Sequence, residues 1–255
     1  MLSYERQEKI LEYLRQNKTE SVTGLSKKLF IGEATIRRDL EKLKGKGYIS
    51  RIYGGAVLRE GLDSEIPLLV REKERMKEKN LIGSLAAGLI NEGDIIMMDS
   101  SSTTYCMVEH MKSKKQLTVI TNGAKTAISL GETLHTKVFC TGGRLREHSL
   151  SYTGETAQKF TENFYADKMF FSCRAISYDK GIMDSSEDEA ELRKVMLRHA
   201  NQVILLCDSN KFNKTAFYKI CDMDKINIIV TDARPSSELL EIAEKDNIEI
   251  IFSGK

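Results

Sequence analysis

Six consecutive residues near the middle of the chain, Asp99 to Thr104 (DSSSTT), carry side chains suited to binding an anion. They follow an apolar run, IIMM, and open a segment with helical spacing. One hydroxyl would serve as an ordinary helix cap, but five in a row exceed that need. Backbone N–H groups and the helix dipole favour an anion at a helix start, and hydroxyls donate as well. Because the glycine spacing and the lysine of a Walker loop are absent, we expect a small phosphorylated molecule and not a nucleoside triphosphate.

Two other places offer a cation beside small or polar residues. In the run TGGR, Gly142 and Gly143 would let a ligand approach the backbone closely, and Arg144 adds a positive charge. Lys211 follows the polar residues DSN and supplies a second positive charge. Each signal alone is weak, because surface Arg and Lys side chains are usually only solvated.

The segment EATIRRDLEKLKGKG, residues 33–47, is the candidate for contacting nucleic acid. Its apolar residues Ile36, Leu40 and Leu43 recur at the spacing of one helical face. Hydroxyl and cationic side chains lie on or beside the opposite face: Thr35, Arg37, Arg38 and Lys42. Such groups suit the phosphates and base edges of a DNA major groove. A solvated amphipathic helix is the alternative explanation.

The neighbouring sequence favours the first explanation. Two helices are predicted before this segment, the first starting at Ser3 and the second carrying Leu25 and Leu29, with a polar break over 17–21. A connection of three residues then leads into the basic helix, which is helix-turn-helix spacing. Residues 48–57 suit a small hairpin with Arg51 and Tyr53 near its tip.

The rest of the chain alternates between strand-like and helix-like segments, which predicts a largely parallel sheet with helices on both faces. The predicted strands are Asp94–Asp99, Leu117–Thr121, Lys137–Cys140, Asp167–Ser172, Gln202–Asp208, Ile226–Thr231 and Ile248–Phe252. The predicted helices are Asn80–Ile90, Thr103–Met111, Glu187–Ala200 and Ser236–Lys245. Five of the strands end in small, hydroxylated or charged residues. Ligands bind outside the carboxyl ends of strands in open α/β sheets, so a site is expected there.

Charge and cysteine usage narrow the class of protein. Through Val57 there are 12 Lys/Arg against 7 Asp/Glu, whereas the remainder has 27 against 30. A basic head on a slightly acidic body indicates that only the head meets a polyanion.

The 5 cysteines form no C-x-x-C pair, so we expect neither disulfides nor a zinc site and place the protein in a reducing cytoplasm. No signal peptide or membrane span is predicted.

The segment ATIRRDLEKLKGKGYISRIYGGAVL resembles the winged helix-turn-helix of the DeoR family of bacterial transcription repressors. Gly32 departs from the Ser or Thr usual in that family, but glycine is an acceptable N-cap. The resemblance and the helical wheel together imply a set of DNA contacts: Thr35, Arg37, Arg38, Lys42, Arg51 and Tyr53. Arg38 faces most directly away from the apolar stripe and ranks first for base contact. Asp39 would repel phosphate, so an ion pair with a basic side chain is its expected role.

The resemblance extends over the body, where DSSSTT, TNGAKTA, TGGRLREHSLSYTGE and CDSNKF look like the DeoR-type sensor domain. That domain is Rossmann-like, similar in fold to ribose phosphate isomerase, and binds phosphorylated sugars as inducers. The effector site implied here is Asp99, Ser100, Ser101, Ser102, Thr103, Thr121, Asn122, Gly142, Gly143, Glu189 and Lys211, with Arg144 added from its position after the glycine pair. Arg193 and Asn210 stand where the family usually has Lys and Ser, which leaves the identity of the sugar phosphate open.

The fold class expected is therefore α/β, with three parts: a winged helix-turn-helix over 1–57, a linker over 58–77 and a sugar-phosphate sensor domain over 78–255. The expected function is repression of a sugar-catabolism operon by a homo-oligomer (dimer or tetramer) that binds double-stranded operator DNA, without cofactor or metal. The alternative is a sugar-phosphate isomerase-like enzyme in which Asp99, Glu189 and Lys211 form an acid/base set. An RNA-binding regulator is disfavoured because no aromatic stacking platform is visible.

Overall fold

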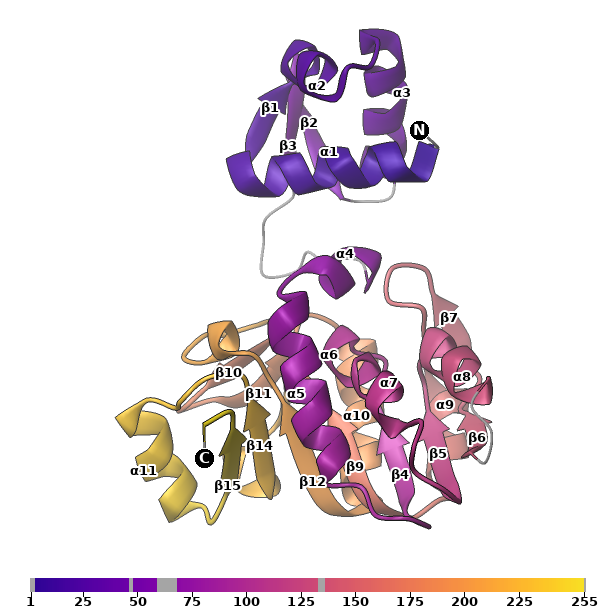
Figure 1. Ribbon diagram of the computed structural model, residues 1–255, viewed down its shortest axis with the longest axis vertical. Coiled ribbons are helices and arrows are strands. Elements are labelled where there is room, and N and C mark those ends of the chain that lie inside the picture. The colour runs from indigo at the N-terminus through magenta and orange to yellow at the C-terminus, as the bar shows by residue number, and fades with distance from the viewer. Residues whose placement is uncertain (1–2, 46–47, 59–67, 133–135, 255) are drawn as a thin grey trace. The chain divides into compact units, whose positions relative to one another are not determined.

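The computed structural model in Figure 1 describes residues 3–45, 48–58, 68–132 and 136–254. The chain divides into two units, Met1–Val70 and Arg71–Lys255. Most of the predicted linker, residues 59–67 including Pro67, lies outside the described residues, so the predicted domain boundaries stay a prediction.

The first unit is a three-helix domain with a small antiparallel sheet. Its elements are α1 (Ser3–Asn17), β1 (Thr19–Ser21), α2 (Val22–Leu29), α3 (Glu33–Gly45), β2 (Ile49–Ile52) and β3 (Gly55–Leu58). The sheet order is β1-β3-β2, so the polar segment predicted to be a break contains a strand that pairs with the wing hairpin. The side chain of Ser21 accepts a hydrogen bond from the Gly24 N–H and starts α2.

The apolar stripe of α3 is buried as its spacing predicts. Ile36, Leu40 and Leu43 are fully buried and pack with Ile10 of α1 and Leu25 of α2 in one cluster. Phe30, in the turn between α2 and α3, adopts the left-handed conformation (φ 55°) that ends α2. The winged helix-turn-helix is thus present.

The second unit is built on a seven-stranded parallel sheet with the order β15-β14-β12-β9-β4-β5-β6. Its strands are β4 (Ile95–Met98), β5 (Leu117–Thr121), β6 (Thr136–Cys140), β9 (Ala166–Phe171), β12 (Ala200–Leu206), β14 (Ile228–Thr231) and β15 (Glu249–Phe252). Each coincides with a predicted strand, and all the pairings are parallel. The α/β fold class predicted from the sequence is confirmed.

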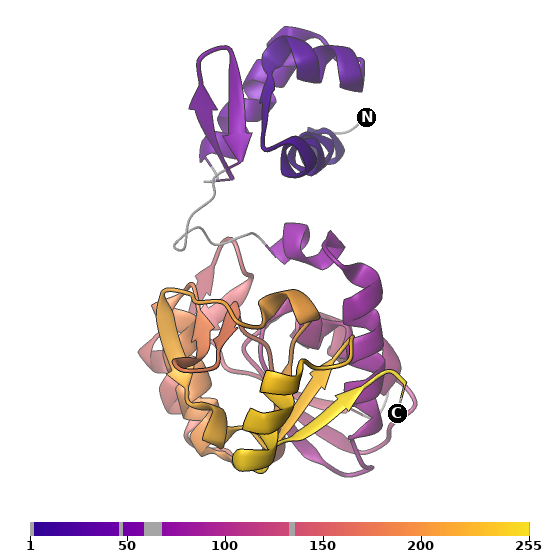
Figure 2. The same ribbon diagram turned by 90° about the vertical axis from the view of Figure 1, so that its left-hand side faces the viewer.

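Helices cover both faces of this sheet (Figures 1 and 2). Successive residues of β4 point to opposite sides: Ile96 and Met98 pack under α5, α7 and α8, whereas Met97 packs toward α9, α10 and α11. The helices are α4 (Leu68–Lys73), α5 (Met76–Gly88), α6 (Ser102–Tyr105), α7 (Met107–Met111), α8 (Ala124–Gly131), α9 (Glu155–Thr161), α10 (Glu187–Arg198) and α11 (Ser237–Lys245). The helix predicted over Thr103–Met111 is divided at Cys106 into α6 and α7.

Short strands that the sequence did not predict lie beyond the carboxyl ends of the sheet. A hairpin joins β7 (Arg144–Arg146) to β8 (Ser151–Thr153), and an antiparallel sheet joins β10 (Ala175–Ser177), β11 (Gly181–Asp184) and β13 (Tyr218–Cys221). Two 3-10 helices follow β12 and β13, at Ser209–Lys211 and Met223–Lys225.

The order of the strands reverses between β4 and β9. From β4 the chain adds β5 and β6 on one side, and from β9 it adds β12, β14 and β15 on the other. Such a switch point leaves a crevice outside the carboxyl ends of the two central strands, where open α/β sheets bind ligands. Asp99 follows β4 and Ser172 follows β9, so both lie at this point.

Candidate functional site

The exposed face of α3 presents the predicted DNA contacts. Arg38 and Lys42 are exposed, and among the described residues neither forms an ion pair. Arg37 is also exposed, but its Nη2 lies 3.1 Å from Glu33 Oε2, one helical turn away. Thr35 is half-buried, and its N–H donates to the Gly32 carbonyl (2.9 Å) at the helix start. The two unpaired cations are therefore those best placed for a polyanion.

The wing contributes Arg51 and Tyr53. Arg51 makes two contacts within its own domain. Its Nη1 lies 2.9 Å from Glu41 Oε1, and its Nε donates to the Gly55 carbonyl (3.2 Å). Tyr53 is fully exposed at the hairpin turn. Asp39 is buried and paired with Arg6, the ion pair that the sequence predicted for it. Burial alone would raise the pKa of Asp39, but hydrogen bonds from Arg6 and Gln7 lower it below the usual value.

In the second unit, Asp99 joins the two central strands at the switch point. Its Oδ1 accepts the Ser101 N–H (3.1 Å), and its Oδ2 accepts the Ser172 N–H (3.2 Å). The carboxylate thus orders the loops after β4 and β9 at once.

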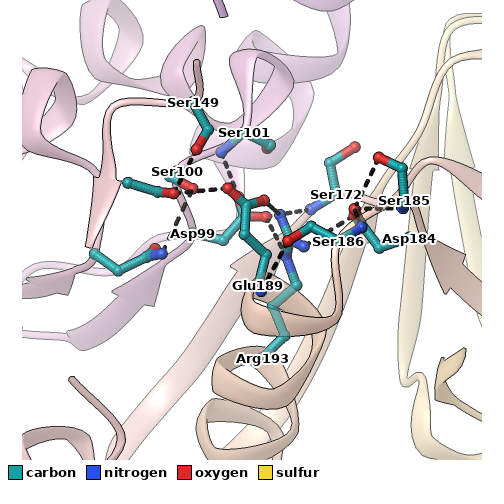
Figure 3. A network of polar contacts seen from close by, with 12 residues as sticks. Asp99, Ser100, Ser101, Ser149, Ser172, Asp184, Ser185, Ser186, Glu189 and Arg193 are labelled. Carbon is teal, nitrogen blue, oxygen red and sulfur yellow. Dashed lines mark hydrogen bonds and ion pairs between the residues drawn. The ribbon is translucent and has the colours of Figure 1, made fainter. Parts of the chain in front are cut away.

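Arg193, one turn after Glu189 on α10, occupies the centre of a buried polar network (Figure 3). Each of its three nitrogens meets a different carboxylate: Nε lies 2.8 Å from Asp99, Nη1 2.9 Å from Asp184 and Nη2 3.1 Å from Glu189. Burial opposes the charged form, but these carboxylates raise the pKa of the guanidinium. The arginine is therefore a structural hub whose planar fork joins the loop after β4 and the end of β11 to its own helix α10, which the shorter lysine ammonium could not do.

Glu189 is a second hub on the same helix. Its Oε1 accepts hydrogen bonds from Ser151 (2.7 Å) and from Arg146 Nη1 (3.0 Å) on the β7–β8 hairpin. Burial would raise its pKa, but the charges of Arg193, Arg71 and Arg146 lower it to about 2. A carboxyl group with that pKa stays ionised at neutral pH, so it positions cations instead of exchanging protons.

The hydroxyl run lies beside this network, and one of its residues caps helix α6. The Ser101 side chain caps α6 by accepting the Thr104 N–H (3.2 Å), and its Oγ lies 2.7 Å from the Thr104 Oγ1. Helix α6 has only 4 residues, so the helix-dipole contribution assumed for a longer helix is small. Thr103 is buried, yet its Oγ1 has no partner within the described part of the chain. Ser102 is buried, and Ser100 Oγ accepts a long hydrogen bond from Asn122 Nδ2 (3.5 Å).

The loop after β5 approaches the hydroxyl run closely. Thr121 Oγ1 accepts the Gly123 N–H (3.1 Å), and a Cβ on Gly123 would lie 3.2 Å from the Ser100 Cα. Asn122 donates from Nδ2 to the Tyr152 carbonyl (3.2 Å), while its buried Oδ1 has no partner among the described residues. The structure thus brings Asn122 and Gly123 close to Ser100, with Thr121 hydrogen-bonded to Gly123.

The glycine pair, Gly142 and Gly143, and the neighbouring Arg144 do not lie in the same part of the site. Gly143 (φ 102°) is a necessary glycine, because a Cβ there would lie 2.7 Å from the Thr153 carbonyl oxygen. Gly142 (φ 64°) has open space beside it. Arg144 does not join the buried network: its exposed side chain pairs with Asp188 on the surface. Arg146, two residues later, is the cation that reaches Glu189.

Lys211 lies at the ends of β9 and β12, and two further cations, on α4 and α5, are close to it or to each other. Lys211 Nζ donates to Ser172 Oγ (2.8 Å) and lies 3.8 Å from Asp208 Oδ2. Lys79 of α5 is buried and donates to the Arg71 carbonyl. Burial, followed by the charge of Lys211, lowers the pKa of Lys79 to about 8. Arg71 has two buried nitrogens, Nε and Nη2, without a hydrogen-bond partner among the described residues.

Sequence reasoning missed several residues of this site. The run REKERMKEK, residues 71–79, alternates in charge, a pattern typical of an exposed helix start, whereas the structure buries Lys79. That correction has a simple cause: the run packs over the carboxyl ends of the strands, and charge alternation does not record which face a fold covers. Arg146 and Asp184 carried no local signal at all.

The described residues contain no helix long and apolar enough to cross a membrane. Within the same residues, no group of His, Cys, Asp and Glu has a geometry that would hold a metal ion.

Comparison with known proteins adds to this geometry. Residues 6–61 match the DeoR-like helix-turn-helix domain, and residues 74–233 match the DeoR C terminal sensor domain. The uncharacterized HTH-type transcriptional regulator YulB of Bacillus subtilis is 36% identical over 98% of this chain and 96% of its own length. A putative aga operon transcriptional repressor of Escherichia coli O157:H7 is 32% identical over 98% of this chain and 94% of its own length. The L-fucose operon activator of Haemophilus influenzae is 30% identical over 97% of this chain and 99% of its own length.

Among solved structures, a ribose 5-phosphate isomerase A from Methanocaldococcus jannaschii covers 55% of each chain with a TM-score of 0.41 and 11% identity. This likeness is too low to support an argument about function.

Proposed function

The chain belongs to the DeoR family of transcription regulators, and we propose that it represses a sugar-catabolism operon under the control of a phosphorylated sugar. The family is one of regulators with a helix-turn-helix domain, so the protein is not the isomerase-like enzyme considered as the alternative. The name of one relative, a putative aga operon transcriptional repressor, supports repression. The name of another, the L-fucose operon activator, supports control of a sugar operon.

The DNA-binding half of the proposal rests on α3. Arg38 and Lys42 are exposed cations without a carboxylate partner in the described chain, on the face opposite the buried stripe. In a helix-turn-helix this face enters the major groove, where Arg reads guanine and Lys binds phosphate or guanine. Thr35, Arg37, Arg51 and Tyr53 are the remaining proposed contacts. Arg37 and Arg51 must first exchange their carboxylate partners for phosphate.

The observation that carries the effector half is a pair of cations that form no ion pair within the described residues: Lys79, which is buried, and Arg71, which is half-buried and whose Nε and Nη2 are buried without a hydrogen-bond partner there. A buried charge is costly unless it is paired. Each of these cations also adds to the repulsion felt by the other, since the charge of Arg71 lowers the pKa of Lys79. A dianionic phosphate between them would remove both costs, and Lys211 is near enough to Lys79 to share it.

Buried polar atoms on the hydroxyl run, on the loop after β5 and at the end of β8 suit the sugar. Buried atoms without partners in the described chain include the Thr103 and Thr153 hydroxyls and the Asn122 Oδ1. Such atoms normally find a partner when they are buried. We assign the predicted residues Ser100, Ser101, Ser102, Thr121, Gly142 and Gly143 to the wall of the same site, and Asp99 and Glu189 to holding it in shape. Arg144 lies outside this set.

We infer that the protein acts as a homo-oligomer, a dimer or tetramer, because helix-turn-helix proteins bind two half-sites with two heads. It acts in the compartment that holds the DNA, the cytoplasm. The effector would favour a state whose heads no longer match the half-site spacing, which requires unequal affinity for the two states.

A thermal-shift panel of sugar phosphates against the full chain tests the effector half. A ligand that binds only the folded state at a hundredfold excess over its Kd stabilises by about 2.7 kcal/mol. We expect a shift with one sugar phosphate and none with the free sugar. Equal shifts with both, or no shift across the panel, would contradict the phosphate-reading site.

A further inference from the structure

Arg75 lies between α4 and α5 and ties this junction to the far half of the chain. Its backbone is left-handed (φ 50°), a conformation that residues other than glycine adopt rarely. Its Nη2 lies 2.8 Å from Asp232 Oδ2, beyond β14, and 3.1 Å from Ser209 Oγ, beyond β12. The first residues of the sensor domain are therefore clamped across the carboxyl ends of the sheet.

Asp208, beyond β12, is shared between this clamp and the proposed effector site. Its Oδ1 accepts the Asn210 N–H (3.2 Å) and lies 3.4 Å from Arg75 Nε. Its Oδ2 lies 3.8 Å from Lys211 Nζ, and its charge also raises the pKa of Lys79. One buried carboxylate thus balances three cations, two of which are proposed to bind phosphate.

The contact between Asp208 and Arg75 is incomplete in this structure. Arg75 Nε is buried and makes no hydrogen bond within the described residues, although Asp208 Oδ1 lies 3.4 Å away, because the N–H is not directed at that oxygen closely enough. A buried donor without an acceptor is unfavourable. A small movement of Asp208 that completes this hydrogen bond would therefore lower the free energy. The attraction of Lys211 and Lys79 for the same carboxylate opposes that movement.

We propose that Arg75 is the residue that transmits effector occupancy to the segment joining the two units. This inference rests on the proposed function. A phosphate bound to Lys79 and Lys211 neutralises their charge, which frees Asp208 to complete its hydrogen bond with Arg75 Nε. The junction at residues 71–75, where the second unit begins, is then held more tightly. Couplings between sites of this kind typically amount to about 5- to 150-fold in affinity.

Hydrogen exchange of the full chain with and without inorganic phosphate tests this coupling. In the wild type we expect phosphate to slow exchange of the amides at 71–75, the junction between α4 and α5, by about fivefold or more. Arg75→Gln should bind phosphate within about threefold of the wild type but lose that slowing. Arg198→Gln, an exposed arginine at the end of α10, is the matched control and should behave as the wild type.

Arg75→Lys serves as a second variant if Arg75→Gln does not fold. It keeps the charge, but a single ammonium cannot hold Asp208 and Asp232 together, so the slowing should again be lost. Slowing that persists in either folded variant overturns the coupling role and leaves the effector site standing. A tenfold loss of phosphate binding in Arg75→Lys would make Arg75 a binding residue and also overturn it. Absence of phosphate binding by the wild type would overturn both proposals.

Discussion

At the scale of single residues, the sensor domain separates two kinds of buried polar group. Asp99, Glu189 and Arg193 satisfy one another and hold the loops together. Thr103 and Arg71 instead keep buried atoms without a partner in the described chain. Substitutions in the first set should cost stability, and those in the second should cost ligand affinity.

Thr103 and its neighbour Thr104 allow a matched test of this distinction. Thr103→Val removes an unpaired hydroxyl, so the free energy of unfolding should hold or rise while affinity for the effector falls by about 1 kcal/mol. Thr104→Val removes the hydroxyl 2.7 Å from Ser101 Oγ and should instead lower stability by about 1 kcal/mol. Urea unfolding and ligand titration measure the two effects. Equal stability losses in both variants would show that Thr103 Oγ1 has a structural partner.

Arg193 is the residue whose loss should be most damaging to stability. Arg193→Met leaves three carboxylates in a buried site without their common cation, and losses of this kind cost about 3–5 kcal/mol. Arg193→Lys should lose less, because it keeps the charge. Arg144→Gln is the control: it breaks an exposed ion pair, so it should change the free energy of unfolding by at most about 1 kcal/mol. Similar losses for Arg193→Met and the control would refute the hub.

We expect the proposed effector binding to depend on pH through Lys79. Because burial and the charge of Lys211 lower its pKa to about 8, Lys79 is mostly charged at pH 7 and mostly neutral at pH 9.5. Asp208 and Glu74 oppose this shift and Arg71 adds to it. The phosphate dianion prefers the charged form, so its binding takes up a proton above pH 8, and affinity should fall by up to about tenfold per pH unit there.

Calorimetric titration of inorganic phosphate at pH 7.5 and 9.5 measures this dependence. Lys79→Met should bind phosphate more weakly at pH 7.5 and show little further loss at pH 9.5. A wild-type affinity that stays constant between the two values would mean that Lys79 does not contact the anion.

At the scale of elements, α3 was recognisable because its apolar spacing and its cations act locally. Arg38→Ala should weaken binding to the specific operator by about 1–3 kcal/mol and relax the base preference at one position, while the fold is kept. Lys42→Ala should weaken binding to all sequences and lower the salt slope by about one unit. Anisotropy titrations at several salt concentrations separate these effects. Unchanged operator affinity in Arg38→Ala would exclude it from base reading.

The strands of the parallel sheet could be predicted for a related reason. A strand buried on both faces must be apolar along its whole length, as IIMM and VILLC are, and such runs are visible in a sequence. Strands of three residues, such as β7, β8 and β10, are too short to show a period. The division between α6 and α7 at Cys106 likewise left no mark in the periodicity.

At the scale of the whole molecule, the site is assembled by the order of the strands, which a single sequence does not state. The hydroxyl run could be predicted because it is continuous. The contacts of Arg193 with Asp99 and of Arg75 with Asp232 join residues 94 and 157 positions apart, and no local pattern connects them. Burial of Lys79 follows from the same assembly, whereas the alternating charges of residues 71–79 are typical of an exposed segment.

Reciprocity between the two units gives a last prediction. If the effector lowers operator affinity by some factor, thermodynamic linkage requires operator DNA to lower effector affinity by the same factor. We expect a sugar phosphate that releases the operator to bind the full chain more weakly when operator duplex is present, by about 5- to 150-fold. Arg38→Ala should reduce this antagonism at a given DNA concentration, because less protein is bound to DNA. Equal effector affinity with and without saturating operator would mean that the two sites are not coupled, and that the sugar phosphate controls transcription by another route.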